Sequence, residues 1–419
     1  AKDTGIQVID MTDIDNHHIL LTRTITLPGR SHNVAVDTVS GFLYTTGSRQ
    51  SGGETTICFD LSDPSNPVKI GNSMTTTYQH DLVPVTFTDG PYAGRQILFG
   101  NGEGRGIEIW DVTNKLAPFL VADLNYPLSG YCHQGWLSDD KQYFYVNDEF
   151  DEKDDAVLTR TLVFDVSDIE NPQLVNTFSS GLPSIDHNLY VKGDFIFEAN
   201  YTSGLRIFDA NDNPTNPVEV GYYDTYPSND NVAYRGAWSN FPFFPSGTVI
   251  VNDINSGLHV FDVSAATVRG VDTSSAVTVR GSNNGGNVGS LQEDDNNYWT
   301  GIPGPVLVFG ESPANFEFNG VAPWDTCSRL SIKAVMKAST SNIGASVEVF
   351  NWDTSVWDTV GSLNLNGSEQ TVDVALTLPN RYLKSDKSLK ARIRAAQTGP
   401  VLVLPWTVLV DELTWKINP

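Results

Sequence analysis

Four histidines stand at matching places of a repeated sequence, and this spacing suggests one shared site. They are separated by 48, 53 and 54 residues, and they are His32, His80, His133 and His187. Equivalent residues of a ring-shaped repeat protein lie at equal radius and height, so four imidazoles would meet near the axis. Neutral imidazole binds zinc, copper and iron, which makes a transition-metal ring one interpretation. Asp81 and Asp186 would then accept hydrogen bonds from the rings beside them.

A structural role is the competing interpretation of the same histidines. A polar residue that enters an inner strand can tie one repeat to the next, and neighbours such as Asn33, Gln134 and Asn188 offer local hydrogen bonds. At the fifth equivalent position the sequence has Arg235, which breaks a symmetric metal ring and would suit an anion at the mouth of a channel. Both interpretations stay open at the level of sequence.

An acidic segment at residues 148–155, DEFDEKDD, is a second candidate site. Its oxygen ligands Asp148, Asp151 and Asp154 suit calcium. The spacing differs from that of an EF-hand loop, and a solvated acidic loop is the alternative. The segment 292–297, QEDDNN, raises the same two interpretations in the last third of the chain.

Aromatic side chains and two glycosylation motifs complete the binding candidates. A sugar-stacking surface would use Tyr298, Trp299, Trp352 and Trp357, although aromatic residues of a sandwich also form its core. Asn-x-Ser/Thr motifs at Asn200 and Asn366 permit N-glycosylation.

No complete catalytic constellation stands out in the sequence. Cys132 and His133 are adjacent, but neighbours on a strand point to opposite faces and do not form a nucleophile–base pair. A nucleophile elbow, a phosphate-binding loop and a dinucleotide fingerprint are all missing. Paired carboxylates for glycoside hydrolysis stay open, because such partners can be distant in sequence. We therefore expect a protein that is not an enzyme.

The elements that would position these residues repeat about every fifty residues. A strand-like phrase such as GLRIFD at 204–209 recurs and closes on an aspartate, and the closing aspartates are Asp10, Asp60, Asp111, Asp165, Asp209 and Asp262. The aspartate and the polar residues after it predict a tight turn. A β-rich period of this length is typical of a β-propeller.

Each repeat contains four short strands, which make one blade. Residues 1–264 therefore predict a propeller of six or seven blades, and the first phrase lacks the two strands that should precede it. An unpaired blade edge favours self-association into an oligomer or filament. Residues 265–419 lose the period and predict a β-sandwich of the jelly-roll type. The fold class is all-β.

Composition narrows the function classes. The formal charge is −24, from 26 basic and 50 acidic residues, and such a surface repels nucleic acid. Three scattered cysteines do not make a disulfide framework. No apolar run reaches the length of a membrane helix.

The first 264 residues resemble the LVIVD-repeat propellers of the choice-of-anchor B family of bacterial surface proteins. The repeat phrases carry the resemblance, together with CHQGWL at 132–137 and DHNLYVKG at 186–193. It implies a secreted or cell-surface protein, in a family whose members carry further N-terminal sequence and varied C-terminal anchors. We expect a structural or interaction protein of this location. The alternatives are a metal-binding protein or metal-dependent enzyme using the axial histidines, and a carbohydrate-binding surface protein.

Overall fold

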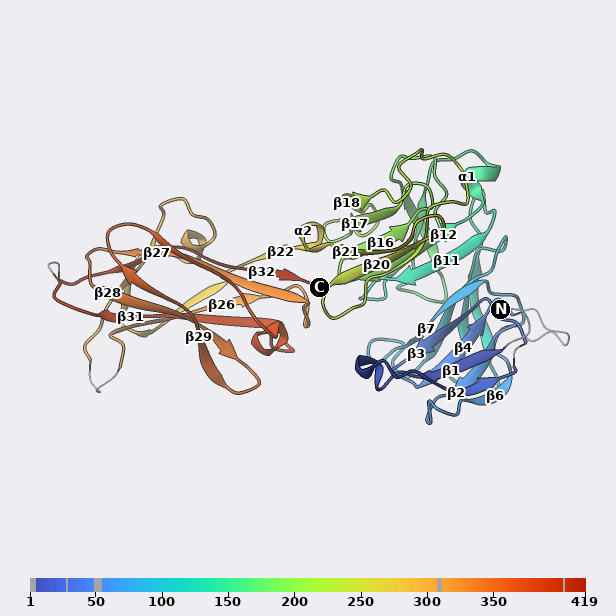
Figure 1. Ribbon diagram of the computed structural model, residues 1–419, viewed down its shortest axis with the longest axis horizontal. Helices are drawn as coiled ribbons and strands as arrows, with labels where there is room; N and C mark the ends of the chain where they lie inside the picture. Colours follow the sequence, from blue (N-terminus) through green and yellow to red (C-terminus); the bar gives the residue numbers. More distant parts are fainter. Residues whose placement is uncertain (1–4, 28, 49–54, 307–310, 402–403) are drawn as a thin grey trace. The chain divides into compact units, whose positions relative to one another are not determined.

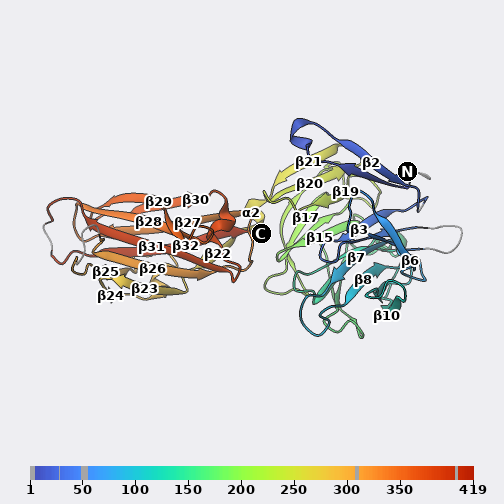
Figure 2. The ribbon, with the colours of Figure 1, turned by 90° about the horizontal axis from the view of Figure 1, so that it is seen from below.

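The computed structural model describes residues 5–27, 29–48, 55–306, 311–401 and 404–419. Nearly all regular structure in these residues is β-strand (Figures 1 and 2), which confirms the predicted all-β fold. The chain forms two compact units, Ala1–Pro242 with Val249–Phe261 and Phe243–Thr248 with Asp262–Pro419. The first is a β-propeller and the second a β-sandwich. Among the described residues, no helix has the length and apolar character needed to cross a membrane.

Four sheets of the propeller, within the described residues, are complete blades of four antiparallel strands in chain order. The first holds β3 (Asn33–Asp37), β4 (Phe42–Thr46), β5 (Ile57–Asp60) and β6 (Val68–Ser73). The second holds β7 (Asp81–Thr86), β8 (Gln96–Asn101), β9 (Ile107–Asp111) and β10 (Phe119–Leu124). The third holds β11 (Cys132–Leu137), β12 (Tyr143–Asp148), β13 (Thr161–Asp165) and β14 (Gln173–Phe178), with the short helix α1 (Asp151–Asp154) after β12. The fourth holds β15 (Asn188–Lys192), β16 (Phe195–Ala199), β17 (Leu205–Asp209) and β18 (Val218–Tyr223).

Two further sheets of the propeller have fewer strands. One is formed by β19 (Ala237–Phe241), β20 (Thr248–Asp253) and β21 (Gly257–Asp262). The other pairs β1 (Ile6–Asp10) with β2 (Leu20–Ile25), joined through the single turn η1 (Ile14–Asn16). By the repeat phrase at its start, β1 corresponds to the third strand of a complete blade and β2 to the fourth. Leu258 and Val260 of β21 are exposed, and self-association through such edges stays a prediction.

The closing aspartates end β1, β5, β9, β13, β17 and β21 by the same turn. Each carboxylate accepts a hydrogen bond from the backbone N–H two residues later, at 2.7–3.0 Å. A short acidic side chain favours this turn because its oxygen accepts the N–H hydrogen bond that a neighbouring strand would otherwise accept. The six aspartates thus hold the equivalent positions that the repeat predicts.

The first strand of each blade is innermost. In order, β3, β7, β11, β15 and β19 each lie against the next. Apolar side chains of the middle strands fill the space between blades, as where Phe99 of β8 meets Phe144 of β12 at 5.5 Å between ring centroids. Each buried phenylalanine contributes about 1.5–3 kcal/mol relative to an exposed one. This packing fixes where the start of every inner strand lies.

The sandwich has two facing sheets. One contains β24 (Ser282–Gly285), β25 (Trp299–Ile302), β32 (Val408–Asn418), β27 (Arg329–Ala338) and β30 (Gln370–Ala375), and β22 (Arg269–Asp272) also pairs with β32. The other contains β23 (Ser275–Arg280), β26 (Ala314–Val321), β31 (Ser388–Gln397), β28 (Ile343–Asn351) and β29 (Val356–Leu365). The single turns are α2 (Ser264–Thr267), η2 (Val288–Leu291) and η3 (Pro379–Tyr382). Alternate residues of β26 and β31 are buried, and Trp299 and Trp415 fill the core between the sheets.

Candidate metal centre

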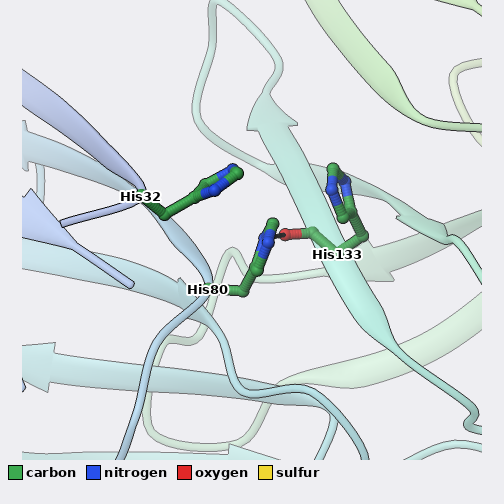
Figure 3. A group of neighbouring side chains, drawn as sticks. All are labelled: His32, His80 and His133. Carbon is green, nitrogen blue, oxygen red and sulfur yellow. Dashed lines mark hydrogen bonds between the residues drawn. The ribbon is translucent and has the colours of Figure 1, made fainter. Parts of the chain in front are cut away.

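The inner strands bring all four predicted histidines together. His133 lies in β11, and each of the other three directly precedes the first strand of its blade. Successive ring centroids, from His32 to His80, His133 and His187, are 4.1, 4.3 and 4.2 Å apart. Figure 3 shows the first three rings, which reach into one region from three different strands. The predicted ring of histidines is therefore a row along neighbouring blades.

Hydrogen bonds between blades fix the tautomer of three of the four rings. Nδ1 of His80 lies 3.1 Å from the backbone oxygen of His133, drawn as a dashed line in Figure 3. Nδ1 of His133 lies 3.1 Å from the oxygen of His187, and Nδ1 of His187 donates to the oxygen of Trp238. A carbonyl can only accept, so each Nδ1 carries the proton and a neutral ring keeps the lone pair on Nε2. Ligand histidines in metal sites are oriented by such bonds.

Burial favours the neutral form of His32, His133 and His187. The pKa of His133 lies well below the ordinary value because of burial, and the neighbouring imidazoles lower it further. Burial also lowers the pKa of His187 to about 4 and lowers that of His32. At neutral pH His133 and His187 are therefore unprotonated on Nε2, which is the form that binds metal.

Glu149 adds a carboxylate that the sequence analysis did not assign to the site. Its two oxygens lie 3.7 Å from Nε2 of His133 and 3.7 Å from Nε2 of His187. The hydroxyl of Tyr201 donates to Oε1 of Glu149 at 2.6 Å, and the Glu149 N–H donates to the oxygen of Tyr131 at 3.1 Å. Burial raises the pKa of Glu149. Its place in the acidic segment 148–155, directly after β12, was the only signal in the sequence.

Two overlapping sets of donors result. The sets are His32 with His80 and His133, and His133 with Glu149 and His187, and the donor atoms of each lie within 4.8 Å of one another. Zinc binds nitrogen at about 2.0–2.1 Å in a tetrahedron, which places its ligands about 3.4 Å apart. The chemistry of the donors therefore fits a transition metal of the zinc class.

Aromatic side chains surround the row of histidines. Tyr131 lies 5.1 Å from the His80 ring, and Tyr201 and Trp238 lie 4.9 and 5.2 Å from the His187 ring. His32 keeps 39% of its side chain exposed. One end of the row is thus open to solvent, while His133 and His187 are buried.

Two of the predicted supporting residues have other roles. Asp186 accepts a hydrogen bond from Asn147 at 2.9 Å. Asp81 accepts one from Thr46 at 3.0 Å and faces His32 at 4.0 Å, with burial raising its pKa to about 7. The predicted carboxylate acceptors were wrong for His80 and His187, whose Nδ1 atoms bond backbone carbonyls instead.

The fifth equivalent position is Trp238 and not Arg235. The oxygen of Trp238 accepts from His187 as the oxygen of His187 accepts from His133, which fixes the correspondence. Arg235 precedes Gly236, whose backbone has a φ of 89°. Because this turn contains extra residues, equal spacing in the sequence pointed to Arg235 in place of Trp238. Arg235 is therefore not equivalent to the histidines, and the anion site predicted from that equivalence has no support.

The predicted calcium loop does not converge. The Asp148 carboxylate accepts four hydrogen bonds, from the Tyr126 hydroxyl and from the backbone N–H groups of residues 130, 131 and 150. Asp151 pairs with Nε of Arg160 at 2.5 Å, and Asp154 is exposed. Asp148 thus closes a turn, Asp151 neutralises an arginine, and the three aspartates do not share a ligand.

Other predicted binding residues are separated in the same way. Asn200 is fully buried and donates to Glu198 at 2.8 Å, so glycosylation there is incompatible with the fold. Asn366 is half-buried and its side chain accepts from the Ser368 N–H at 2.7 Å. Trp299 belongs to the core of the sandwich, so the predicted four-residue sugar surface was wrong.

Trp352 and Trp357 do lie together, on either side of Phe350, at 4.7 and 5.2 Å. Arg392 lies over Trp357, 4.3 Å from the ring centroid.

Cys132 is buried beside Asn101, and burial raises the pKa of its thiol to about 12, so it remains protonated and unreactive.

Comparisons with known proteins assign the chain to no family. No family model matches the chain, and no curated protein matches it. The similar solved structures include an exo-β-1,3-galactanase from Phanerochaete chrysosporium with β-1,3-galactotriose, at 10% identity and a TM-score of 0.38 over 99% of both chains. A protein from Lactobacillus plantarum is 10% identical, with a TM-score of 0.43 over 86% of this chain and 93% of its own. A periplasmic gluconolactonase from Pseudomonas aeruginosa is 14% identical, with a TM-score of 0.40 over 64% of this chain and 90% of its own.

Two of these neighbours are named as enzymes, which stands against the expectation that this chain is not an enzyme. At 10–14% identity the likeness concerns the fold, and neither named activity passes to this chain. Membership of the choice-of-anchor B family and a place at the cell surface stay predictions.

Proposed function

We propose that the propeller is a metal-binding domain and that the chain is a metal-dependent enzyme. The observation that supports this most directly is the arrangement of the imidazoles. Nδ1 of His80, His133 and His187 is used by a neighbouring blade, and the remaining nitrogens of His133 and His187 face one carboxylate, Glu149. The structural and the metal-binding interpretations of the histidines are thus compatible, because they use different nitrogens.

The reaction class that fits these donors is metal-assisted hydrolysis. A zinc-class ion held by three protein ligands keeps an open position and lowers the pKa of bound water to about 7. His133 belongs to both donor sets, so it is the residue on which binding depends most. Glu149, with its raised pKa, is placed to be a ligand or to accept a proton beside the ion. The exposed side of His32 supplies access from solvent.

Metal analysis of the purified full chain tests the proposal. We expect about one transition-metal ion per chain after incubation with zinc and desalting, and visible absorption bands when cobalt replaces zinc. In the double variant His133→Asn/His187→Asn the bound metal should fall at least about tenfold. Asparagine places an amide nitrogen near the position of Nδ1, so the bonds between blades are retained. His18→Gln is the control, because His18 is exposed on the turn after β1.

Activity is tested on the same preparations. Hydrolysis of glycoside, lactone and ester substrates should disappear with a chelator and return with zinc. Folded wild-type protein that takes up no transition metal from a zinc excess would reject the metal centre. Protein that binds metal but hydrolyses none of these substrates would leave a metal-binding domain without the proposed reaction.

A further inference from the structure

Three carboxylates from distant parts of the sequence meet in the sandwich. They belong to Asp294 in the loop after η2, Glu369 in the turn before β30, and Asp411 in β32. One oxygen of each lies within 4.8 Å of one oxygen of the others. Two oxygens bound to one calcium ion at about 2.4 Å can lie at most about 4.8 Å apart. The three groups therefore satisfy the separation that a shared calcium ion requires.

A β-bulge positions Asp411. In the pairing of β27 with β32, Val335 is opposite Glu412 and Met336 is opposite Val410, so Asp411 is the extra residue. On its other side β32 pairs with β25, where Trp299 is opposite Val410. A bulge turns the side chain of the extra residue out of the regular alternation. Here the bulge lies beside the start of β25, where residues 292–297 enter the sheet.

Asp411 is a buried carboxylate, and one of its two oxygens accepts no hydrogen bond from the described residues. Its exposed fraction is 0%, and Oδ2 accepts a hydrogen bond from the Asn296 N–H at 2.9 Å. Oδ1 is also buried, and no described residue donates a hydrogen bond to it. An unpaired buried carboxylate oxygen costs several kcal/mol unless a proton or a cation satisfies it. Asp294 and Glu369 each place one carboxylate oxygen within 4.8 Å of an oxygen of Asp411.

The three carboxylates and the lysine beside them carry a net negative charge. Nζ of Lys337 lies 3.4 Å from Oε1 of Glu369, and the Tyr298 hydroxyl donates to the same oxygen. Lys333 is already paired with Glu412 at 2.5 Å. Three carboxylates and one lysine carry a net charge of −2, which a divalent cation balances.

We propose that Asp294, Glu369 and Asp411 bind one calcium ion. Calcium accepts six to eight oxygens in flexible geometry, so waters and loop oxygens complete its shell around these three ligands. The ion would fix the loop 292–297 onto β32 and satisfy Oδ1 of Asp411. This site lies in the sandwich and uses no residue of the histidine row, so it stands or falls independently of the proposed function.

Terbium luminescence tests the site, because Tyr298 touches Glu369 and can transfer excitation to a bound lanthanide. Full-length protein freed of metal by a chelator should show terbium emission on excitation near 280 nm, and calcium should displace it at a ratio of one per chain. Asp294→Asn should weaken calcium binding about tenfold or more, and Asp411→Asn should abolish it. Asp373→Asn is the matched control, an exposed carboxylate on β30 of the same sheet.

The variants separate the cation from a shared proton. If Asp294 and Asp411 merely share a proton, wild type and Asp294→Asn will show the same weak calcium response in calorimetry, and the proposal is overturned. Asp294 is exposed, so Asp294→Asn keeps the test valid even if Asp411→Asn fails to fold. Repeating the titration in His133→Asn/His187→Asn should leave calcium binding unchanged, and its loss there would also count against the sandwich site.

Discussion

Nδ1 of His133 donates a hydrogen bond of 3.1 Å to the backbone oxygen of His187, which stands 54 residues further along the chain. The bond joins the inner strands of the third and fourth blades. It also determines the tautomer of His133, and so aims Nε2 at Glu149, 3.7 Å away. One contact thus serves the fold and prepares the site, and each effect can be removed separately.

Replacing His133 by alanine should remove both effects, whereas asparagine should remove one. His133→Ala leaves the buried oxygen of His187 without its donor and opens a cavity, so the free energy of unfolding should fall by about 2–3 kcal/mol. His133→Asn retains a donor near Nδ1 and should lose about half as much. Urea denaturation measures both, and His18→Ala, at an exposed site, is the control. Equal losses in the two variants would contradict the role given to Nδ1.

Tyr201→Phe should weaken the metal centre without dismantling it. The Tyr201 hydroxyl holds Oε1 of Glu149 at 2.6 Å, and loss of such a supporting bond usually costs about 10–100-fold in metal affinity. Zinc competition against a chromophoric chelator measures the affinity. Tyr234→Phe is the control, because its ring lies 5.4 Å from that of Tyr201 and the bond to Glu149 stays. Unchanged zinc affinity in Tyr201→Phe would place Glu149 outside the metal site.

Glu152 should make the folded protein less stable as pH rises. It is buried in α1, and burial together with the charge of Asp151 raises its pKa above the ordinary value of 4.5. A carboxyl group with a raised pKa binds its proton more tightly in the folded state. Its stabilising effect is therefore complete below pH 4.5 and is lost as pH rises through neutral and alkaline values, at up to about 1.4 kcal/mol per pH unit.

Glu152→Gln should remove this dependence. Denaturation between pH 5 and pH 9 should show a flatter decline in the variant and a higher stability than wild type at the alkaline end. Asp154→Asn, on the exposed side of the same helix, should keep the slope of wild type. A variant that declines as steeply as wild type would mean that another group carries the pH dependence.

Gly47→Ala should disturb the start of the histidine row. Gly47 has a φ of 62°, and a Cβ there would lie 2.2 Å from Cβ of His32. The added strain and displacement should lower the free energy of unfolding by about 2–4 kcal/mol. Gly41→Ala is the matched control, with a φ of 74° and no described atom within 4 Å of the added Cβ. Its cost should be the backbone strain alone, about 1 kcal/mol, and an equal cost at both positions would exclude the clash with His32.

The repeat could be predicted from local sequence, because a few neighbouring residues determine a strand and the aspartate turn that follows it. Asp60 and Asp209 show this, since each receives the N–H two residues later whatever the rest of the chain does. Equal spacing then placed His80 and His133 side by side. The alignment failed at Arg235 because an irregular turn around Gly236 changed the count by three residues, and only the bond from His187 identifies Trp238 as the equivalent.

The sequence by itself determined the blades, the sandwich and the meeting of the histidines, because these follow from periodic patterns. Tertiary structure alone decided that Glu149 joins His133 and His187, while its neighbours Asp148 and Asp151 turn to other partners. It alone brought Asp411 to Asp294, 117 residues away, through a bulge that breaks the alternation of β32. The physical reason is that carboxylates of different strands meet through sheet register and packing, which no local spacing records.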